Sequence, residues 1–357
     1  MEDYSSTKLK AYVEVRGGVV SLDLSRKGLS RVPDAVTELT EVQELKLNNN
    51  NLTELPTSIN KLKNLIRLHL YCNKLTKLPP EIGDFKELRT VDVSHNQLVS
   101  LPTSIQKLNQ LEDLHLSWNK LTELPPEIGD LKELRRLDVS HNQLVSLPTS
   151  IQKLNHLQRL HLNSNKVTEL PSEIVGLKEL RRLDVSNNQM VSLPTSIQKL
   201  NQLEELHLNG NKLTELPSEI TDLKELRRLD VSFNQLVSLP TSIEKLNQLE
   251  ELDVNGNRLT ELPFEIGNLK ELRWLDVSYN QLVSLPTSIQ KLNQLRGLHL
   301  YNNRLTELPS EIGDLKELRS LDVSGNPLSM DAIQLLEMKK KGMTGSVITG
   351  GCGNNFQ

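Results

Sequence analysis

The sequence has little of three features that would point to common protein classes. It contains two cysteines, Cys72 and Cys352, which lie far apart and do not make a disulfide framework. No apolar run approaches the roughly 18 residues that span a bilayer. The start, MEDYSSTKLK, lacks the basic segment and apolar stretch of a secretory signal. We therefore expect neither a secreted nor a membrane-spanning nor a zinc-caged protein, and a cytoplasmic location.

An excess of basic residues is also missing. Lysine and arginine number 42 against 46 acidic residues, which gives a formal net charge of -4. Proteins that bind nucleic acid usually carry a basic excess, so we expect no nucleic-acid partner. The 357 residues would suffice for two average domains or for one elongated array, so length does not decide the architecture.

One pattern is abundant. LPTSIQKLNQLEELHLNGNKL at 193–213 returns as LPTSIEKLNQLEELDVNGNRL at 239–259, and the shorter period is 23 residues. Fourteen units follow one another without insertion from Val19 to the unit that begins at Leu318. No unit can bury its apolar positions alone, so neighbouring units have to stack. A second period of 46 residues lies over the first and indicates duplication of a two-unit cassette.

Each unit has the same internal pattern of residue types. Apolar residues at its fourth and sixth positions, such as Leu206 and Leu208, predict a short strand with one buried face. Thirteen of the 16 prolines share one phase, from Pro33 to Pro309, and mark the start of an outer segment because proline has no N–H. An asparagine follows the strand, and its amide can bond the backbone of its own and the neighbouring turn. These asparagines are Asn50, Asn73, Asn96, Asn119, Asn142, Asn165, Asn188, Asn211, Asn234, Asn257, Asn280, Asn303 and Asn326.

These motifs resemble the leucine-rich repeat family. The form LPxxIxxLxxLxxLxLxxNxL is similar to the intracellular Ras-group subclass, and the resemblance covers about residues 19–328. It implies an α/β fold, a right-handed solenoid (horseshoe) of about 14 repeats of 23 residues. In such a solenoid a parallel β-sheet lines the concave side, and short helical or extended segments cover the convex side.

Both ends of the array are expected to be capped. Residues 1–18 form an N-terminal cap in which Leu9, Tyr12 and Val13 have helical spacing that stops at Gly17–Gly18. The array itself covers 19–328. Ser329 is a plausible N-cap for a capping helix at 329–342. The glycine-rich segment 343–357 is expected to be a disordered tail.

The concave face carries residue types that could do chemistry. Aspartate and histidine alternate along one column, as at Asp184 and His207, which could suggest metal ligands. A ladder in which carboxylates hold each imidazole explains the alternation without a metal. Cys72, His95 and Asp92 could form a nucleophilic set, but an open sheet offers no evident oxyanion hole. We expect no metal, no cofactor and no enzymatic activity.

A run of arginines on the same face has two interpretations. It could hold a phosphate or an acidic peptide, or it could be a solvated and partly paired face, which we favour. The sequence predicts that this run faces only Asp138 and Asp184. The arginines are Arg135, Arg136, Arg159, Arg181 and Arg182.

Aromatic residues are scarce, at 3% of the chain, and six of the eleven lie at surface positions around the strands. The core uses leucine, isoleucine and valine, so these rings are not needed for folding, and exposed tryptophan and tyrosine are frequent at binding hot spots. We predict one main partner-binding patch and a second one around Trp118, with scattered surface rings as the alternative. The main patch is Phe233, Arg273, Trp274, Tyr279, Arg296 and Tyr301, and the second is His95, Trp118 and His141.

The sequence therefore predicts a non-catalytic, monomeric scaffold that binds a protein partner on its concave face. The family resemblance implies intracellular signal transduction, with a small GTPase, kinase or phosphatase as partner. One alternative is the sensor portion of a larger GTPase- or kinase-containing protein, suggested by the Asn-Pro-Leu ending at 326–328. Another is an extracellular immune-type recognition module, suggested by the glycosylation sequon at 51–53.

Overall fold

The computed structural model describes residues 6–334 and 346–348. The chain divides into two compact units, residues 1–180 and 181–357, which are described separately. Both consist of the same 23-residue building block, in which a three-residue strand, a turn and a five-residue 3-10 helix follow one another. The predicted leucine-rich repeat solenoid with parallel strands is thereby confirmed.

The repeat pattern explains the alternation of burial in each strand. In β10 (Glu205–His207), Leu206 is fully buried while Glu205 and His207 are half-exposed, because successive side chains of a strand point to opposite faces. The outer segments begin where the prolines predict. Pro217, for example, has φ -63° and ψ 143° and directly precedes a 3-10 helix, which it can do because it needs no N–H partner there.

Unit 1 contains one sheet of eight strands. Strand β1 runs antiparallel to β2, with Val13 opposite Leu22, and the strands from β2 to β8 pair in parallel in chain order. The strands are β1 (Val13–Arg16), β2 (Val19–Asp23), β3 (Glu44–Lys46), β4 (Arg67–His69), β5 (Thr90–Asp92), β6 (Asp113–His115), β7 (Arg136–Asp138) and β8 (Arg159–His161).

The helices of unit 1 are short, and all but the first are 3-10 helices. They are α1 (Ser6–Leu9), η1 (Lys10–Tyr12), η2 (Asp34–Glu38), η3 (Thr57–Lys61), η4 (Pro80–Asp84), η5 (Thr103–Lys107), η6 (Pro126–Asp130), η7 (Thr149–Lys153) and η8 (Ser172–Gly176).

Unit 2 repeats this arrangement, with all described strands parallel and paired in chain order. Its strands are β9 (Arg182–Asp184), β10 (Glu205–His207), β11 (Arg228–Asp230), β12 (Glu251–Asp253), β13 (Trp274–Asp276), β14 (Gly297–His299), β15 (Ser320–Asp322) and β16 (Ser346–Ile348). Its 3-10 helices are η9 (Thr195–Lys199), η10 (Ser218–Asp222), η11 (Thr241–Lys245), η12 (Phe264–Asn268), η13 (Thr287–Lys291) and η14 (Ser310–Asp314).

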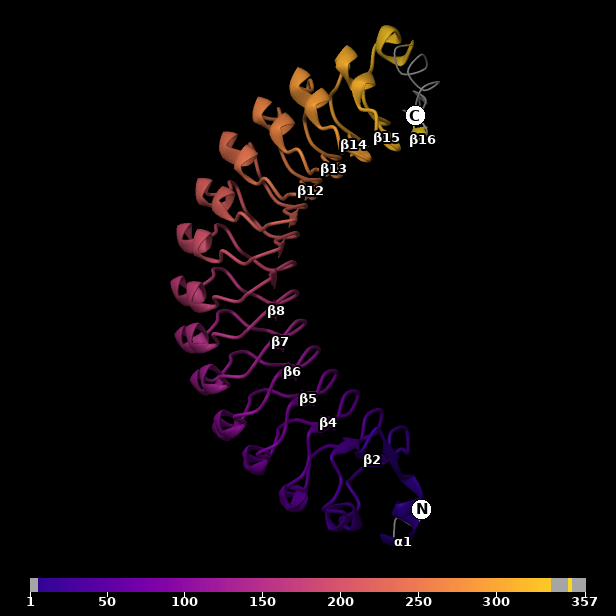
Figure 1. Cartoon of the computed structure of the whole chain (residues 1–357), viewed down its shortest axis with the longest axis vertical. Coiled ribbons are helices and arrows are strands. Elements are labelled where there is room, and N and C mark those ends of the chain that lie inside the picture. Colours follow the sequence, from indigo (N-terminus) through magenta and orange to yellow (C-terminus); the bar gives the residue numbers. More distant parts are fainter. Residues whose placement is uncertain (1–5, 335–345, 349–357) are drawn as a thin grey trace, which may run out of the picture. The chain divides into compact units, whose positions relative to one another are not determined.

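Within each unit the strands follow the inside of the curve and the 3-10 helices follow the outside (Figure 1). The core is the layer of leucine, isoleucine and valine between them. We call the solvent side of the sheet the strand face. It displays the third and fifth residues of every repeat, and the turn after each strand forms its rim.

The turn asparagines form a buried hydrogen-bonded ladder. Asn257 is representative: its Oδ1 accepts from Leu236 N at 3.0 Å, and its Nδ2 donates to Val231 O at 3.0 Å and Val254 O at 2.9 Å. The same three bonds recur from Asn119 to Asn165 and from Asn211 to Asn326. Each amide therefore links two repeats and satisfies backbone groups that burial would otherwise leave unpaired.

The 46-residue period has a packing basis. A Cβ on Gly83 would lie 2.4 Å from Ser104 O, and a Cβ on Gly129 would lie 2.3 Å from Ser150 O. Each glycine belongs to a 3-10 helix of one repeat type and each serine to the helix of the other type, which follows it. Where the helix carries glycine, as at Gly83 and Gly129, this close approach leaves no room for a side chain, whereas Val175 and Thr221 hold the equivalent position in two other cassettes. The two helices of a cassette therefore pack tightest where glycine faces serine.

The N-terminal segment differs from the helical expectation. Leu9 and Tyr12 lie in helical turns, but Val13 begins β1, and Gly17 and Gly18 form the turn of an antiparallel hairpin with β2. Both glycines have positive φ, at 57° and 80°. The reason is that β2 offers an open edge, and strand β1 satisfies its backbone groups where a helix could not.

The C-terminal segment is described in part. Ala332 N donates to the Ser329 hydroxyl at 3.2 Å, so Ser329 caps the helical turn at 330–334. Residues 335–342 of the expected helix lie outside the described residues. Within the expected tail, Ser346–Ile348 is not irregular but forms strand β16, parallel to β15. The open edge of β15 favours this pairing.

Candidate partner-binding surfaces

The main predicted patch lies on the strand face and rim of unit 2. Trp274 is 39% exposed, Tyr279 50% and Phe233 61%, whereas Tyr301 is half-buried. The structure arranges these rings as separate contacts on neighbouring repeats. Trp274 stands on β13, while the other three rings lie at the rim, in the turns that follow their strands.

Trp274 leans toward the next strand. Its indole lies 4.5 Å from the His299 ring at an interplanar angle of 55°. The ring also covers Gly297, which pairs with Trp274 in the sheet and on which a Cβ would lie 2.3 Å from the indole. Glycine at this position therefore leaves the space that Trp274 fills.

The rim rings of unit 2 show the same direction of lean. Phe233 lies over Gly256 of the next repeat, where a Cβ would come within 2.8 Å of the ring. Tyr279 meets Tyr301 edge to face, with 5.0 Å between ring centroids. The hydrogen-bonded contact with Tyr301 raises the pKa of Tyr279. Phe233 and Tyr279 have φ 50° and 52°, so the left-handed turn itself directs these side chains outward.

The two arginines of the patch have different roles. Arg273 Nη1 lies 3.0 Å from Glu250 Oε2. The other oxygen of this carboxylate, Oε1, forms an ion pair with Arg227 Nη1 at 2.9 Å. Arg296 is exposed. Arg273 is thus held in an ion-paired row, whereas Arg296 extends into solvent beside Gly297.

Between the rings runs a column of carboxylates. Asp230, Asp253 and Asp276 occupy equivalent positions on β11, β12 and β13 and are direct neighbours in the sheet. One oxygen of each accepts a backbone N–H two residues on; for Asp253 the donor is Asn255. Burial raises the pKa of Asp253 to about 6, with the charges of Asp230 and Asp276 adding to it, and the Asn255 bonds offset only part of this shift.

The second predicted site is a stack of three rings at the rim of unit 1. Trp118 lies parallel to His95 at 5.2 Å and to His141 at 3.9 Å, with interplanar angles of 9° and 10°. Their φ values are 56°, 52° and 51°, so the same left-handed turn places all three. The column continues to Cys72 on one side and Ser164 on the other, whose small side chains leave the outer faces of the stack uncovered by rings.

The arginine run is paired more widely than the sequence predicts. Arg135 and Arg136 of unit 1 approach Glu112 and Asp113 at 4.0 Å and 3.8 Å. In unit 2, Arg181 and Arg182 form ion pairs with Glu204 and Glu205. The prediction that these side chains face only Asp138 and Asp184 is wrong, because long arginine side chains reach the neighbouring strand. These four cations are therefore already engaged within the protein.

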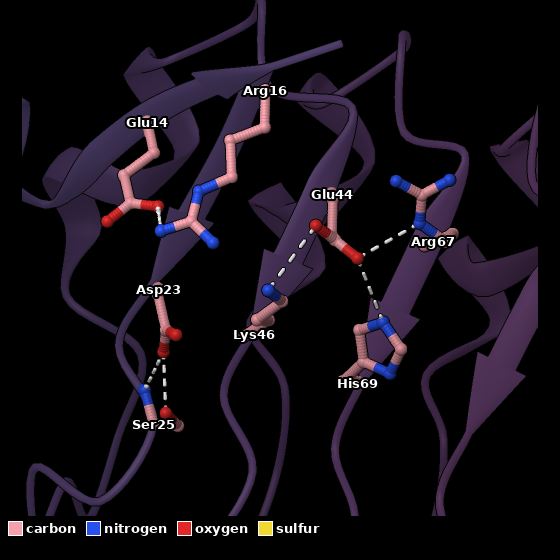
Figure 2. A network of polar contacts seen from close by, with 8 residues as sticks. All are labelled: Glu14, Arg16, Asp23, Ser25, Glu44, Lys46, Arg67 and His69. Carbon is pink, nitrogen blue, oxygen red and sulfur yellow. Dashed lines mark hydrogen bonds and ion pairs between the residues drawn. The ribbon is translucent and has the colours of Figure 1, made fainter. Parts of the chain in front are cut away.

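A polar network stabilises the first strands of unit 1 (Figure 2). Glu44 lies 2.9 Å from Arg67 Nε, 3.3 Å from His69 Nε2 and 3.5 Å from Lys46 Nζ. Burial alone would raise the pKa of Glu44, but hydrogen bonds from Arg67 and Ser21 and the nearby cations hold it at about 2. All three partners of Glu44 come from the same or the next strand, so the network connects β3 with β4 and its carboxylate is already engaged.

One exposed ring escaped the sequence analysis. Phe264 begins η12, is 54% exposed, and lies under Lys291 Nζ at 5.0 Å from the ring centroid. It lines a surface cavity of about 600 Å³ together with Pro263 and Pro286. The sequence does mark Phe264 as exceptional, since the equivalent residues of the same repeat type are serine or proline. Phe264 belongs to the 3-10 side, so it presents an exposed ring outside the strand face.

Residues 6–334 and 346–348 contain neither a metal-binding cluster nor a membrane-spanning helix. In that part of the chain, no group of three or more His, Cys, Asp or Glu side chains is arranged to hold a metal ion. Over the same residues, no helix is both long and apolar enough to cross a membrane.

Family models match most of the repeat array. A model described as leucine rich repeat matches residues 40–98, 63–121, 86–144, 115–167 and 201–259, which together cover more than half of the chain. A second model, described as leucine-rich repeat region, matches residues 149–213 and 252–338. No curated protein matches the chain at a significant level.

Solved structures extend the likeness to the whole chain. A leucine-rich repeat protein of Leptospira interrogans is 35% identical over 98% of this chain and 100% of that one, with a TM-score of 0.77. The plant peptide hormone receptor RGFR1, solved with RGF2, is 30% identical over 84% of this chain but 54% of the receptor, at TM-score 0.69. The Arabidopsis receptor kinase HAESA, solved with the peptide hormone IDA and the co-receptor SERK1, is 27% identical over 93% of this chain and 66% of its own, at TM-score 0.67. On the combined evidence of repeat, fold and family models, the chain belongs to the leucine-rich repeat family.

Proposed function

We propose that this chain is a non-catalytic scaffold that binds a protein partner on the strand face of unit 2. The observation that carries the proposal is the pairing of exposed rings with glycines, Trp274 over Gly297 and Phe233 over Gly256. The fold needs none of these rings, since its core is aliphatic. Exposed rings held in one orientation lose little entropy on binding, as hot-spot residues should.

The context of binding is part of the same proposal. The LPxxI form of the repeats supports the Ras-group subclass, whose members are similar to adaptors for small GTPases, kinases or phosphatases. We accordingly propose a monomeric signalling adaptor in the cytoplasm. Size-exclusion chromatography with light scattering tests the monomer, and fractionation of cells that produce the tagged chain tests the compartment.

A second candidate is the recognition portion of a longer protein. The chain spans 54% of the peptide hormone receptor RGFR1, which was solved with RGF2, and 66% of HAESA, which was solved with the peptide hormone IDA. In this candidate the strand face would capture a peptide and a separate region would transmit the signal. A transcript that continues past Gln357 into a GTPase or kinase motif would support it, and secretion of the tagged chain would favour an extracellular recognition role.

Affinity capture tests the main proposal. The full chain is compared with Trp274→Ala/Tyr301→Ala and with Phe264→Ala, which removes an exposed ring from the 3-10 side. We expect the double variant to lose its partners and Phe264→Ala to retain them. Loss of partners only with Phe264→Ala would move the site to the 3-10 side, and unchanged capture by the double variant would end the proposal.

A further inference from the structure

The carboxylate column of unit 2 breaks the order of the array. Aspartate and histidine alternate from Asp184 through His207 to Asp230, but the next repeat carries Asp253 where the alternation calls for histidine. Three aspartates therefore stand side by side on β11, β12 and β13. Adjacent strands are about 4.8 Å apart, so the three carboxylates form an acidic row roughly 10 Å long.

The cations nearest to this row are already engaged. Arg228 Nη2 lies 3.3 Å from Glu251 Oε1, and Glu250 takes both Arg227 and Arg273. No ion pair links Asp230, Asp253 or Asp276 to a cation among the described residues, and burial, together with the charges of Asp230 and Asp276, raises the pKa of Asp253. The negative charge of the acidic row is consequently not neutralised by a cation among the described residues.

Aromatic side chains flank the acidic row on both sides. Trp274 occupies the third position of its repeat, two residues before Asp276 on the same face of β13. Phe233 and Tyr279 lie on the other side, at the rim beyond the ends of β11 and β13. Carboxylates flanked by aromatic rings suit lysine and arginine, which join a cation to an aliphatic stem. The stem packs on the rings and the cation pairs with the carboxylates.

We propose that the partner places a segment with lysine or arginine side chains across β11, β12 and β13, with its cations on Asp230, Asp253 and Asp276 and its stems against Trp274 and Tyr279. This inference rests on the proposed function of the strand face and names the chemistry of the partner. Side chains two residues apart in an extended segment are separated by roughly 6.8 Å. Two alternate basic residues therefore match the row of three carboxylates.

A defined peptide tests the proposal on the full chain. A fluorescently labelled peptide in which lysine alternates with glycine is titrated with the protein and followed by fluorescence anisotropy. Asp253→Asn/Asp276→Asn removes two charges, yet asparagine keeps a side-chain oxygen that can accept from Asn255 N and Ser278 N. The matched control, Asp184→Asn/Asp322→Asn, removes the same charge from the same column of the unit outside the acidic row.

We expect the acidic-row variant to bind the peptide about ten-fold more weakly, as for the loss of one charge-assisted hydrogen bond. The control variant should remain within about two-fold of the unchanged chain, because Asp184 and Asp322 lie outside β11, β12 and β13, where the segment is proposed to bind. A peptide with glutamate in place of lysine should not bind. Added salt should weaken the interaction, since the carboxylates are partly open to solvent.

Several outcomes would overturn the inference. Equal losses of affinity in both variants would mean that the peptide responds only to the net charge of the protein. Absence of peptide binding would rule out a basic segment as the ligand of this face. Binding of maltohexaose but not of the lysine peptide would assign the flanking rings to a sugar, and concentration-dependent self-association abolished by Asp253→Asn/Asp276→Asn would assign the face to a second copy.

The proposed function has a separate failure. If captured partners bind undiminished to Asp253→Asn/Asp276→Asn but are lost with Trp274→Ala/Tyr301→Ala, the basic segment is wrong and the strand face still binds protein. If the Trp274→Ala/Tyr301→Ala variant still captures its partners, the proposed function is wrong, regardless of the result with the peptide.

Discussion

Trp274 lies over Gly297 of the adjacent strand, in a space that any larger residue would occupy. The contact is a cross-strand pair in which one side chain covers the backbone of its partner, comparable to aromatic residues that shield glycine in other sheets. It holds the ring in one orientation against His299, 4.5 Å away. A residue without a side chain thus contributes to the shape of the candidate binding surface.

The first prediction follows from this pair. Gly297→Ala should push the Trp274 ring off the strand and away from His299, because the new Cβ would lie 2.3 Å from the indole. In a Trp118→Phe background, Trp274 emission should shift to longer wavelength and acrylamide quenching should increase. Because a flexible ring can move aside, we expect a stability loss of only about 1 kcal/mol.

A double-mutant cycle provides the control for this pair. Gly297→Ala should cost less stability in a Trp274→Ala background, where no ring has to be displaced. If the two substitutions were additive and the emission of Trp274 unchanged, the ring would not depend on Gly297.

The second prediction concerns the asparagine ladder. Asn257→Ala removes three hydrogen bonds of 2.9–3.0 Å and leaves Leu236 N without a partner, while the carbonyls of Val231 and Val254 each keep one bond, from Asn234 and Asn280. We expect a loss of about 3 kcal/mol in the free energy of unfolding, measured by urea denaturation followed by circular dichroism. Exposed Asn293 serves as the control, and Asn293→Ala should change stability by less than about 0.5 kcal/mol. Similar effects of both substitutions would contradict the structural role of the ladder.

Much of the fold could be predicted because the same residue pattern recurs in every repeat. A period of 23 residues with alternating leucines fixes strand, register and buried face together, as at Leu206 in β10. The type of the outer segment could not be predicted in the same way, since Pro217 excludes a strand interior but permits either a 3-10 turn or an extended chain. Strand β1 was missed because Leu9, Tyr12 and Val13 fit a helical pattern that the open edge of β2 overrides.

The surface was harder to predict than the fold. Position in the repeat identifies which side chains reach solvent, but not the partners that long side chains choose. Arg135 therefore reaches Glu112 of the preceding repeat, which the strand pattern alone did not reveal. The remaining information lies in departures from the repeat. Glycine at 297, phenylalanine at 264 and aspartate at 253 each stand where the other repeats of the same type carry another residue.

The third prediction concerns the ring stack of unit 1. His141→Ala should uncover one face of Trp118, which lies 3.9 Å from the His141 ring. In a Trp274→Phe background, the emission of Trp118 should shift to longer wavelength, and stability should fall by about 1 kcal/mol, as for other stacked aromatic pairs. The control is His156→Ala, since His156 lies away from the stack and contacts Glu179 at 3.0 Å. Emission that responds equally to both substitutions would indicate that the stack does not persist in solution.

The fourth prediction is the pH dependence set by Asp253. Burial and the neighbouring carboxylates raise the pKa of Asp253 to about 6 from its ordinary 3.8, so the folded protein favours the protonated form. The native state is therefore least penalised below about pH 4, and the penalty grows as the pH rises to about 6 and then stays constant. Asp253→Asn should consequently be more stable than the unchanged chain by about 1–2 kcal/mol at pH 7.5, after allowance for solvent screening, and nearly equal at pH 4. Urea denaturation at pH 4, 5, 6 and 7.5 measures the difference, with Asp184→Asn as the control. A constant difference across this range would show that Asp253 titrates as an ordinary carboxyl and that the acidic row carries no unmet charge.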